Sequence, residues 1–390
     1  MLSSRQRLDV GGMSRSPTRI KGRQEGTVSK SSLVISNVFL LVLLVGSLFL
    51  EKSSKSCPQQ ALVTMSKKES IPIICDSKKE DVAVTGTKQA TPSLPEKKCI
   101  LKFRDEKMAF CNFVNIANGG NFGDELGPVV SSQLVENLFG CSAKNLKTLN
   151  LKTDEEIRKK DGIVCFFSLG SVFHKVRSGD YIWGTGINPT WQSQYPKPLT
   201  IYAVRGKLTE ELVQNRLKYT KPLALGDPGF AIPTLFPELL TMRKASRTKS
   251  KGNRFCFVPH AHDTTSAKAQ LDKSIRIITV YQRWRPVVET LAKECDYVAS
   301  TSLHGIIESD ALGIPTLWFQ WFNSTVSHTE GQFKYLDYFS TVNKTISPTS
   351  DISQVLNKSA YAIPLKASVG EELVKDMQAS FPYHLFETIR

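Results

Sequence analysis

The sequence predicts a two-lobed α/β fold in which each lobe is a parallel sheet covered by helices, behind an N-terminal transmembrane helix. Three observations lead to this prediction. Apolar runs of strand length alternate with helical patterns from residue 106 onward, which is typical of parallel sheets. One basic, polar segment, 242–253, interrupts the alternation and is the best candidate for a hinge. Residues 31–50 carry no charge. At 390 residues, the length allows about two to three domains.

The segment 31–50 is expected to be a retained signal anchor, with 1–30 as a basic cytosolic tail and 51–105 as a lumenal stem. Twenty helical residues span about 30 Å, the thickness of a bilayer core. Basic residues are more frequent before the segment than after it, which favours a cytosolic N-terminus: Arg19, Lys21, Arg23 and Lys30 precede it, and Lys52 and Lys55 follow. The alternative is a cleaved signal peptide, with Val45-Gly46-Ser47 as the cleavage site.

Features beyond the anchor agree with a lumenal body. Asn323, Asn343 and Asn357 each begin a glycosylation sequon. Eight cysteines could pair in an oxidising lumen, although connectivity cannot be read from a sequence; Cys165, inside an apolar run, is expected to be a small buried hydrophobe. Tail, anchor, stem and body together resemble the layout of Golgi glycan-modifying enzymes, so we expect a single-pass type II Golgi membrane protein.

The charge of the chain does not indicate a nucleic-acid partner. Lysine and arginine number 51 against 36 acidic residues, a net charge of +15. Much of that excess lies in 1–30 and 51–100. The body contains no aromatic-basic RNP run, zinc-finger spacing or bZIP heptads. We therefore expect no binding to DNA or RNA.

The first lobe, 106–241, is expected to begin with a strand, a glycine-rich turn and a helix. The helix should run from about Asp124, as its N-cap, to Leu138, with Gly140 at its end. The run Ile163–Leu169 is continuously apolar, as expected for a strand buried on both faces. The other expected elements are the strands Cys111–Ile116, Tyr181–Trp183 and Thr200–Val204, the helix Lys207–Leu217, and Leu223–Leu225 leading into a turn.

The second lobe, 254–390, resumes the alternation after the hinge. Its expected strands are Phe255–Val258, Ile275–Tyr281, Tyr297–Ser300 and Ile314–Gln320. The expected helices are Pro286–Cys295 and Gly305–Leu312.

Candidate site residues lie where these strands end, because ligands in open α/β sheets bind outside the carboxyl ends of the strands. The turn 118–125 holds Asn121, Gly123, Asp124 and Glu125. Its glycines let the backbone approach a ligand, and the helix start favours an anion. The alternative is a purely structural turn. Because no correctly spaced GxGxxG or P-loop is present, nucleotide binding is not implied.

Three further side chains follow expected strands. Arg205 could bind a phosphate or carboxylate through a bidentate pair of hydrogen bonds. The alternative is an ion pair at the surface with Glu210 or Glu211. His174 is a lone histidine in a loop. His260 belongs to Pro259-His-Ala-His-Asp263, which looks like a metal cluster but lacks further ligands at zinc-like spacing. A loop lining the cleft is the preferred interpretation, and no metal is expected.

The most specific motif is 299–318, which encodes a strand, a turn, a helix start and a second strand around His304. A histidine at such a turn faces the cleft and can exchange protons near neutral pH. The alternative is a structural, helix-capping histidine.

Taken in order, these motifs resemble the polysaccharide pyruvyl transferase family over about 110–340. The matching segments are N-G-G-N-F-G-D-E at 118–125, L-G-S-V-F-H at 169–174, W-G-T-G at 183–186, V-R-G at 204–206, L-G-D-P at 225–228, S-L-H-G-I-I-E-S-D-A-L-G-I-P at 302–315 and G-Q-F-K-Y-L-D-Y at 331–338.

The resemblance implies the two-lobe fold of B-type glycosyltransferases. It also implies transfer of a carboxyethylidene group from phosphoenolpyruvate to a sugar diol, and galactose is the expected acceptor. The anchored layout is similar to that of the fungal Golgi enzyme that pyruvylates galactose on N-glycans, although the identity of the acceptor does not follow from that similarity. His304 becomes the expected catalytic group. The donor should contact Arg205, Lys334, Ser302, Leu303 and Gly123. The acceptor should lie near Asn121, Asp124, Glu125, His174 and His260.

One residue departs from the family pattern: many members have arginine at the position of Ser302. Either donor binding depends more on Arg205 and Lys334, or this branch differs in donor or rate. Phosphoenolpyruvate is the donor substrate, and no cofactor is expected. Two alternatives stay open: a Golgi glycosyltransferase that uses a nucleotide sugar, and a catalytically silent glycan-binding protein.

Overall fold

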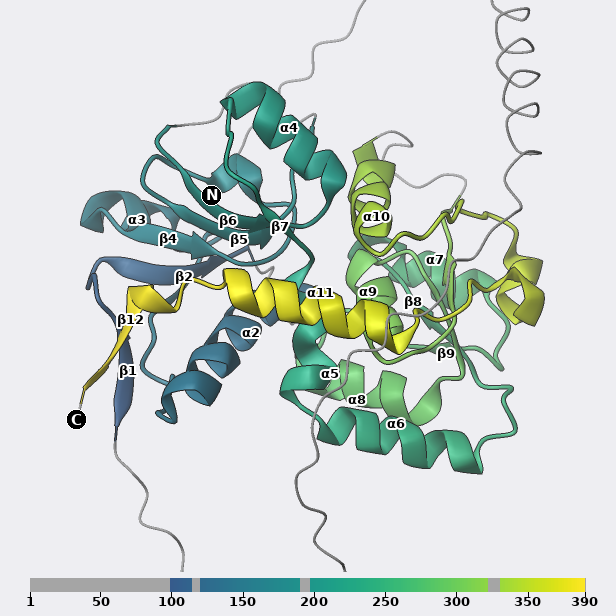
Figure 1. The fold of residues 1–390 in the computed structure, drawn as a ribbon. Coiled ribbons are helices and arrows are strands. Elements are labelled where there is room, and N and C mark those ends of the chain that lie inside the picture. The colour runs from purple at the N-terminus through teal and green to yellow at the C-terminus, as the bar shows by residue number, and fades with distance from the viewer. Residues whose placement is uncertain (1–98, 114–119, 190–196, 322–329, 390) are drawn as a thin grey trace, which may run out of the picture. The chain divides into compact units, whose positions relative to one another are not determined.

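The computed structural model describes residues 99–113, 120–189, 197–321 and 330–389. They form two parallel sheets with helices between and around them (Figure 1). The six-stranded sheet has the order β3-β2-β4-β5-β6-β7, and the four-stranded sheet has the order β11-β10-β8-β9. This confirms the prediction of an α/β fold with parallel sheets. The tail, the anchor and nearly all of the stem lie outside the described residues, and none of the helices within those residues has the length and apolar character to span a membrane.

The six-stranded sheet follows the predicted alternation closely. Its strands are β2 (Met108–Asn112), β3 (Thr148–Asn150), β4 (Val164–Phe167), β5 (Tyr181–Thr185), β6 (Thr200–Val204) and β7 (Ala224–Leu225). Its helices include α2 (Phe122–Phe139), α3 (Glu155–Asp161) and α4 (Lys207–Leu217). The bounds of β6 and α4 are those predicted, whereas β2 begins three residues before the predicted strand.

Helix α2 begins earlier than its sequence indicates. Asn121, not Asp124, is the N-cap, and its side chain accepts a hydrogen bond from the Gly123 N–H over 3.1 Å. The prediction that Asp124 caps the helix is therefore wrong; an asparagine three residues earlier serves the same purpose. At the other end, Gly140 adopts φ 64° and ends the helix as predicted.

The four-stranded sheet contains β8 (Phe255–Val258), β9 (Arg276–Ile277), β10 (Tyr297–Ser300) and β11 (Thr316–Trp318). Its helices are α7 (Thr264–Gln270), α8 (Trp284–Glu294), α9 (Leu303–Ala311) and α10 (Glu330–Thr341). The bounds of β8 and β10 are as predicted, but β9 is only two residues long. Helix α9 begins two residues before the predicted start, so that His304 lies inside its first turn.

The segment 242–253 is not the irregular polar linker that its composition predicts. After the short helix α5 (Ile232–Leu235), helix α6 (Glu238–Lys249) runs through most of it. Leu239 and Arg243 are buried, and the Arg243 guanidinium donates a hydrogen bond to the carbonyl of Cys295. Because α6 is anchored by one leucine and one buried arginine, it has almost no apolar stripe, and its hydrophobic pattern does not predict a helix.

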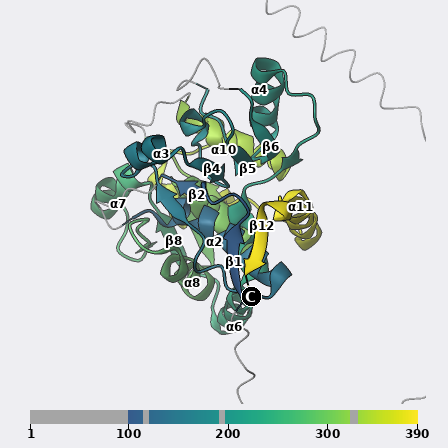
Figure 2. The ribbon, with the colours of Figure 1, turned by 90° about the vertical axis from the view of Figure 1, so that its left-hand side faces the viewer.

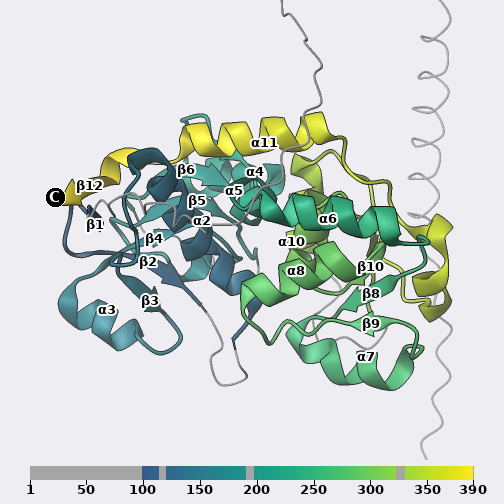
Figure 3. The same cartoon turned by 90° about the horizontal axis from the view of Figure 1, so that it is seen from below.

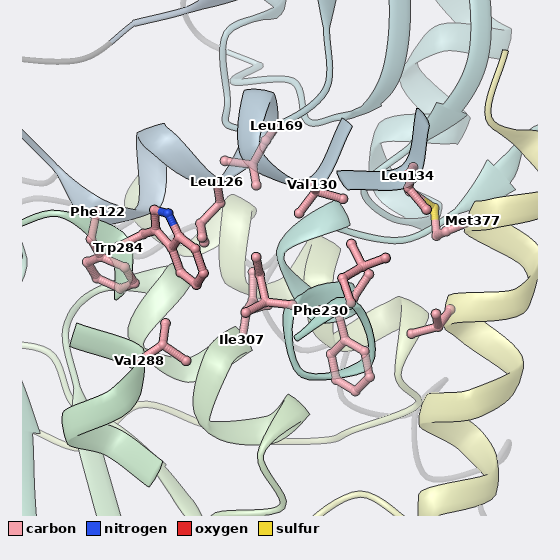
Figure 4. Packing of buried hydrophobic residues seen from close by; sticks show 14 of the residues in the cluster. Phe122, Leu126, Val130, Leu134, Leu169, Phe230, Trp284, Val288, Ile307 and Met377 are labelled. Carbon is pink, nitrogen blue, oxygen red and sulfur yellow. The ribbon is translucent and has the colours of Figure 1, made fainter. Parts of the chain in front are cut away.

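Both faces of each sheet are buried, and one apolar cluster spans the space between the two sheets. It includes Phe110 and Phe166 from the six-stranded sheet and Val258 and Val298 from the four-stranded sheet. Figure 4 shows the α2 residues of this cluster beside Trp284 of α8 and Ile307 of α9. The labelled residues are Phe122, Leu126, Val130, Leu134, Leu169, Phe230, Trp284, Val288, Ile307 and Met377. This packing brings the first turn of α2 to the edge of the other sheet.

The C-terminal helix α11 (Ala367–Ser380) crosses the molecule and ends beside the six-stranded sheet (Figure 3). The indole N–H of Trp183, on β5, donates to the Met377 carbonyl over 3.1 Å. The chain then ends in β12 (Phe386–Ile389), which pairs antiparallel with β1 (Ile100–Phe103) beside the C-terminus (Figure 2). The segment from α11 to β12 thus helps to hold the described fold together.

Within the described residues, three disulfides connect Cys99 to Cys141, Cys111 to Cys165, and Cys256 to Cys295. Cys165 is buried, as expected, but it does more than pack as a small hydrophobe, because its disulfide to Cys111 joins β4 to the neighbouring strand β2. A sequence places each cysteine in its strand, but only the strand order makes these two adjacent.

The predicted glycosylation asparagines that the structure describes lie at the surface. Asn343 and Asn357 are both exposed. Asn323 lies outside the described residues.

Candidate active site

The carboxyl ends of strands from both sheets supply the residues around His304. His304 follows β10 as the second residue of α9. The turn before it is fixed by Ser300, whose hydroxyl donates to the Val258 carbonyl over 2.8 Å, while the Ser302 N–H donates to the Ser300 hydroxyl over 2.9 Å. Ser302 and Leu303, both expected at the donor, are buried, and the Leu303 side chain belongs to the apolar core.

Gly123, at the start of α2, lies directly against the His304 ring. A methyl group at Gly123 would overlap Nδ1 of His304, so that only glycine allows this approach. The neighbouring Phe122 ring stands edge-on to the imidazole, with 6.5 Å between centroids. Two motifs separated by about 180 residues are thereby brought together, as the expected donor site requires.

His304 is held as a neutral imidazole. Burial, together with the nearby charges of Arg205 and Lys334, lowers the pKa of His304 to about 3. Its Nε2 lies 3.9 Å from Oδ2 of Asp227, and neither atom has a hydrogen-bond partner within the described part of the chain. A neutral imidazole near these two cations has one unprotonated ring nitrogen, which can accept a proton from a substrate hydroxyl if the other nitrogen releases one.

Asp227 is a site residue that the sequence analysis did not single out. It precedes the 3-10 turn η4 (Pro228–Ala231), just after β7, and its Oδ1 accepts from the Gly229 N–H over 3.0 Å. Burial raises the pKa of Asp227 to about 6, against the opposing charge of Arg205. Its place after a strand, inside the matching L-G-D-P segment, was the signal that could have identified it.

Arg205 is buried rather than exposed, so the surface pairing with Glu210 or Glu211 is wrong. Its Nε donates to Asp337 on α10 over 3.0 Å, and one terminal nitrogen donates to the Ser171 hydroxyl over 2.9 Å. The other terminal nitrogen, Nη2, has no partner among the described residues. The N–H groups of Nη2 are thus available to donate hydrogen bonds to an anion.

Lys334, on α10, supplies a second cation and lies over the ring of Tyr335 at 5.2 Å. Burial and the neighbouring Arg205 lower the pKa of Lys334 to about 8, although Asp124 and Asp263 act in the opposite direction. The Lys334 charge in turn depresses the pKa values of His304 and His260. Lys334 is therefore close to His304, His260, Arg205 and Asp124.

The adjacent acids Asp124 and Glu125 have different surroundings. Burial raises the pKa of Asp124 to about 7, with Lys334 opposing and Glu125 adding to the shift. Glu125 instead accepts a hydrogen bond from the Trp284 N–H over 3.0 Å and pairs with Arg283 over 3.1 Å. Glu125 therefore caps the N-terminus of α8, whereas the carboxyl group of Asp124 interacts with the charge of Lys334 in the site.

The two other candidate histidines lie at different distances from this chemistry. His260 follows β8, and its backbone N–H donates a hydrogen bond to the Thr301 hydroxyl over 2.7 Å. Burial, together with the charges of Lys334 and His262, lowers the pKa of His260 to about 3. His174 contacts the ring of Phe113 near the end of β2, with 6.4 Å between centroids, and lies three residues from Ser171. Burial lowers its pKa as well, together with Lys175.

The loop 259–263 does not assemble a metal cluster within the residues that the structure describes. In those residues, no three histidine, cysteine or acidic side chains gather as metal ligands would. His260 and His262 lie with their ring centroids 5.3 Å apart.

Residues 121–323, just over half of the chain, match the family model for polysaccharide pyruvyl transferase. The chain belongs to this family and is an enzyme of this class, a transferase that acts on a polysaccharide. It is also similar to an uncharacterized protein of Acanthamoeba polyphaga mimivirus, with 27% identity over 225 residues, 56% of this chain and 70% of the viral one. Among solved structures, the wall teichoic acid polymerase TagF superposes with a TM-score of 0.35 and 9% identity, over 70% of this chain and 82% of TagF.

Proposed function

We propose that this enzyme transfers the carboxyethylidene group of phosphoenolpyruvate to two hydroxyls of one sugar, forming a cyclic ketal. The observation that best supports this reaction is His304: a neutral imidazole flanked by two cations, Arg205 and Lys334. Phosphoenolpyruvate brings a carboxylate and a phosphate, which such cations bind, and its acceptor brings hydroxyl protons, which a neutral imidazole can accept.

The donor site in this proposal consists of the free Nη2 of Arg205, the Lys334 ammonium and the helix start at Leu303. Ser302 replaces the arginine of many relatives, and Arg205 and Lys334 would carry more of the anion binding as a result. Asp124 lies beside Lys334 and would orient an acceptor hydroxyl. Galactose is the acceptor that we expect.

The reaction balances without an outside proton. The first acceptor hydroxyl adds to the central carbon of phosphoenolpyruvate while the methylene carbon gains a proton and becomes a methyl group. The second hydroxyl then displaces phosphate from the same carbon, and its proton leaves with the phosphate. One group near the reacting atoms must therefore both accept and return a proton, and His304 suits this task. No cofactor or metal ion is required.

We also propose that the two sheets form the two lobes of a B-type glycosyltransferase arrangement, anchored by 31–50 in the Golgi membrane with the body in the lumen. The three disulfides support an oxidising compartment. The exposed positions of Asn343 and Asn357 are compatible with glycan attachment.

The test is donor dependence. The full-length enzyme, purified in detergent, is incubated with phosphoenolpyruvate and a panel of sugar acceptors that includes galactosides, and the products are analysed by mass spectrometry with phosphate release in parallel. A ketal-bearing sugar with equimolar phosphate supports the proposal. Transfer only from a nucleotide sugar would indicate a glycosyltransferase instead, and glycan binding without any turnover would indicate a silent binding protein.

A further inference from the structure

A buried carboxyl group without a hydrogen bond lies one helical turn beyond His304. Glu308, on α9, is completely buried, and neither of its side-chain oxygens has a hydrogen-bond partner within the described part of the chain. An unsatisfied buried polar group costs stability, and in a native protein it calls for an explanation. An apolar side chain would serve the packing of α9 better. A chemical role for the acid is therefore worth pursuing.

Glu308 and Asp227 flank the same glycine. A methyl group at Gly229 would lie 2.8 Å from Oε1 of Glu308 and 3.2 Å from Oδ1 of Asp227, so the backbone approaches both acids closely only because this residue is glycine. Oδ1 of Asp227 is occupied by the Gly229 N–H, whereas Oδ2, unpartnered among the described residues, faces Nε2 of His304. Glu308 and Asp227 are thus neighbours, as Asp227 and His304 are, although no hydrogen bond joins Glu308 to Asp227 in the described part of the chain.

Burial shifts the pKa values of the three groups in different ways. Burial and the nearby Asp227 raise the pKa of Glu308 well above its usual value, whereas burial raises the pKa of Asp227 to about 6 and lowers the pKa of His304 to about 3. The charge of Arg205 acts on both Asp227 and His304, Lys334 acts on His304, and Asp337 acts on Asp227. Burial therefore favours the protonated form of Glu308, while at neutral pH Asp227 is largely ionised and His304 is neutral.

We infer that Glu308, Asp227 and His304 form a proton relay for the proposed pyruvyl transfer, with Glu308 as a positioning residue that stores the proton. The inference rests on the proposed function. His304 cannot easily become an imidazolium between Arg205 and Lys334, so a proton leaving one ring nitrogen must be replaced at the other. In the forward step, Glu308 first passes its proton to the Asp227 carboxylate. Nδ1 then gives its proton to the methylene carbon while Nε2 receives the proton that Asp227 holds.

The return step restores every group. The proton of the attacking hydroxyl goes to Nδ1, Nε2 returns its proton to Asp227, and Asp227 returns it to Glu308. The acceptor thus loses one proton and the donor carbon gains one, with no net change in the enzyme. The 3.9 Å between His304 and Asp227 is longer than a hydrogen bond, as catalytic contacts often are before the substrate binds.

The decisive variant is Glu308→Gln, which keeps the shape and the neutral state of the side chain but cannot pass a proton. We expect kcat to fall by roughly 10²–10⁴-fold, while KM for phosphoenolpyruvate stays within about twofold. Glu308→Asp, which retains an acid, should recover part of the loss. The matched control is Ser309→Ala, also buried on α9, where the hydroxyl only donates to the Gly305 carbonyl; its kcat should be unchanged.

A second measurement does not depend on turnover. The infrared spectrum of the unmodified enzyme at neutral pH should contain the C=O band of a protonated, buried carboxylic acid, and this band should be missing in Glu308→Gln. An enzyme without the band would overturn the relay, and so would a Glu308→Gln variant with normal kcat. If the unmodified enzyme makes no ketal but its spectrum contains the band, the proposed function is wrong, whereas the inference that Glu308 holds a proton still stands.

Discussion

Arg205 and Asp337 form a buried ion pair that joins the end of β6 to the middle of α10, with 3.0 Å between Nε and Oδ2. Asp337 also accepts from the N–H and the hydroxyl of Thr209, at 2.8 Å and 2.7 Å. Lys334 lies one turn before Asp337 on the same helix. The pair therefore orients the free edge of Arg205 and holds the helix that carries the second cation.

The first prediction concerns the stability of this pair. Asp337→Ala should lower the free energy of unfolding by about 3–5 kcal/mol, because it leaves the Arg205 guanidinium buried without its counter-charge. Denaturant unfolding followed by circular dichroism measures the change. Glu211→Ala, at an exposed position on α4, is the control and should change stability by no more than about 0.5 kcal/mol. Equal effects of the two variants would show that the pair is not important for stability.

The second prediction concerns His304. His304→Ala should reduce kcat by roughly 10²–10⁴-fold, the usual range for a positioned acid or base, with a normal melting temperature. His384→Ala is a suitable control, since His384 is exposed and its Nε2 contacts the Tyr202 hydroxyl, outside the candidate site. A folded His304→Ala enzyme with near-normal turnover would transfer the role to His260 or His174.

The third prediction tests the contact between Gly123 and His304. Gly123→Ala should displace the imidazole, because the added methyl group would occupy the position of the ring. A displacement of about 1 Å at a catalytic group can cost roughly 10²-fold in rate. Gln133→Ala on the same helix is the control for α2 itself. If Gly123→Ala has normal kcat, the ring can move without loss and the close packing is incidental.

The fourth prediction concerns pH. Lys334 has a pKa lowered to about 8, so its ammonium loses charge as the pH rises through 8. KM for phosphoenolpyruvate should therefore be constant below that pH and increase above it. In Lys334→Arg, the guanidinium stays charged, and the increase should move to higher pH. Steady-state kinetics between pH 6 and pH 10 make this comparison, and identical profiles would exclude Lys334 from donor binding.

The fifth prediction follows from the raised pKa of Glu308. A carboxyl group with a higher pKa in the folded than in the unfolded protein favours folding when protonated, so its contribution is lost as the pH rises above the unfolded value of about 4.5. Glu308→Gln lacks this dependence. Relative to the unmodified protein, the variant should gain up to about 1.4 kcal/mol of stability per pH unit above 4.5. Unfolding curves at several pH values test this, and Ser309→Ala should show a constant offset.

Much of the local structure could be predicted from the sequence. The bounds of β6, α4, β8 and β10 agree with the patterns, because a buried parallel strand and an amphipathic helix have periodicities that the chain itself displays. Helix α6 could not be predicted in this way. Its burial depends on Arg243 meeting a carbonyl 52 residues away, and nothing local marks that partner.

The sequence by itself determined that His304 follows a strand and opens a helix, and that Arg205 follows another strand. Only the tertiary structure decided which side chains these two meet. Arg205 pairs with a residue 132 positions away, and Asp227 and Glu308 converge on His304 through a shared glycine. The reason is physical: backbone preferences depend on nearest neighbours along the chain, whereas the charge state of a buried histidine depends on the groups that packing brings beside it.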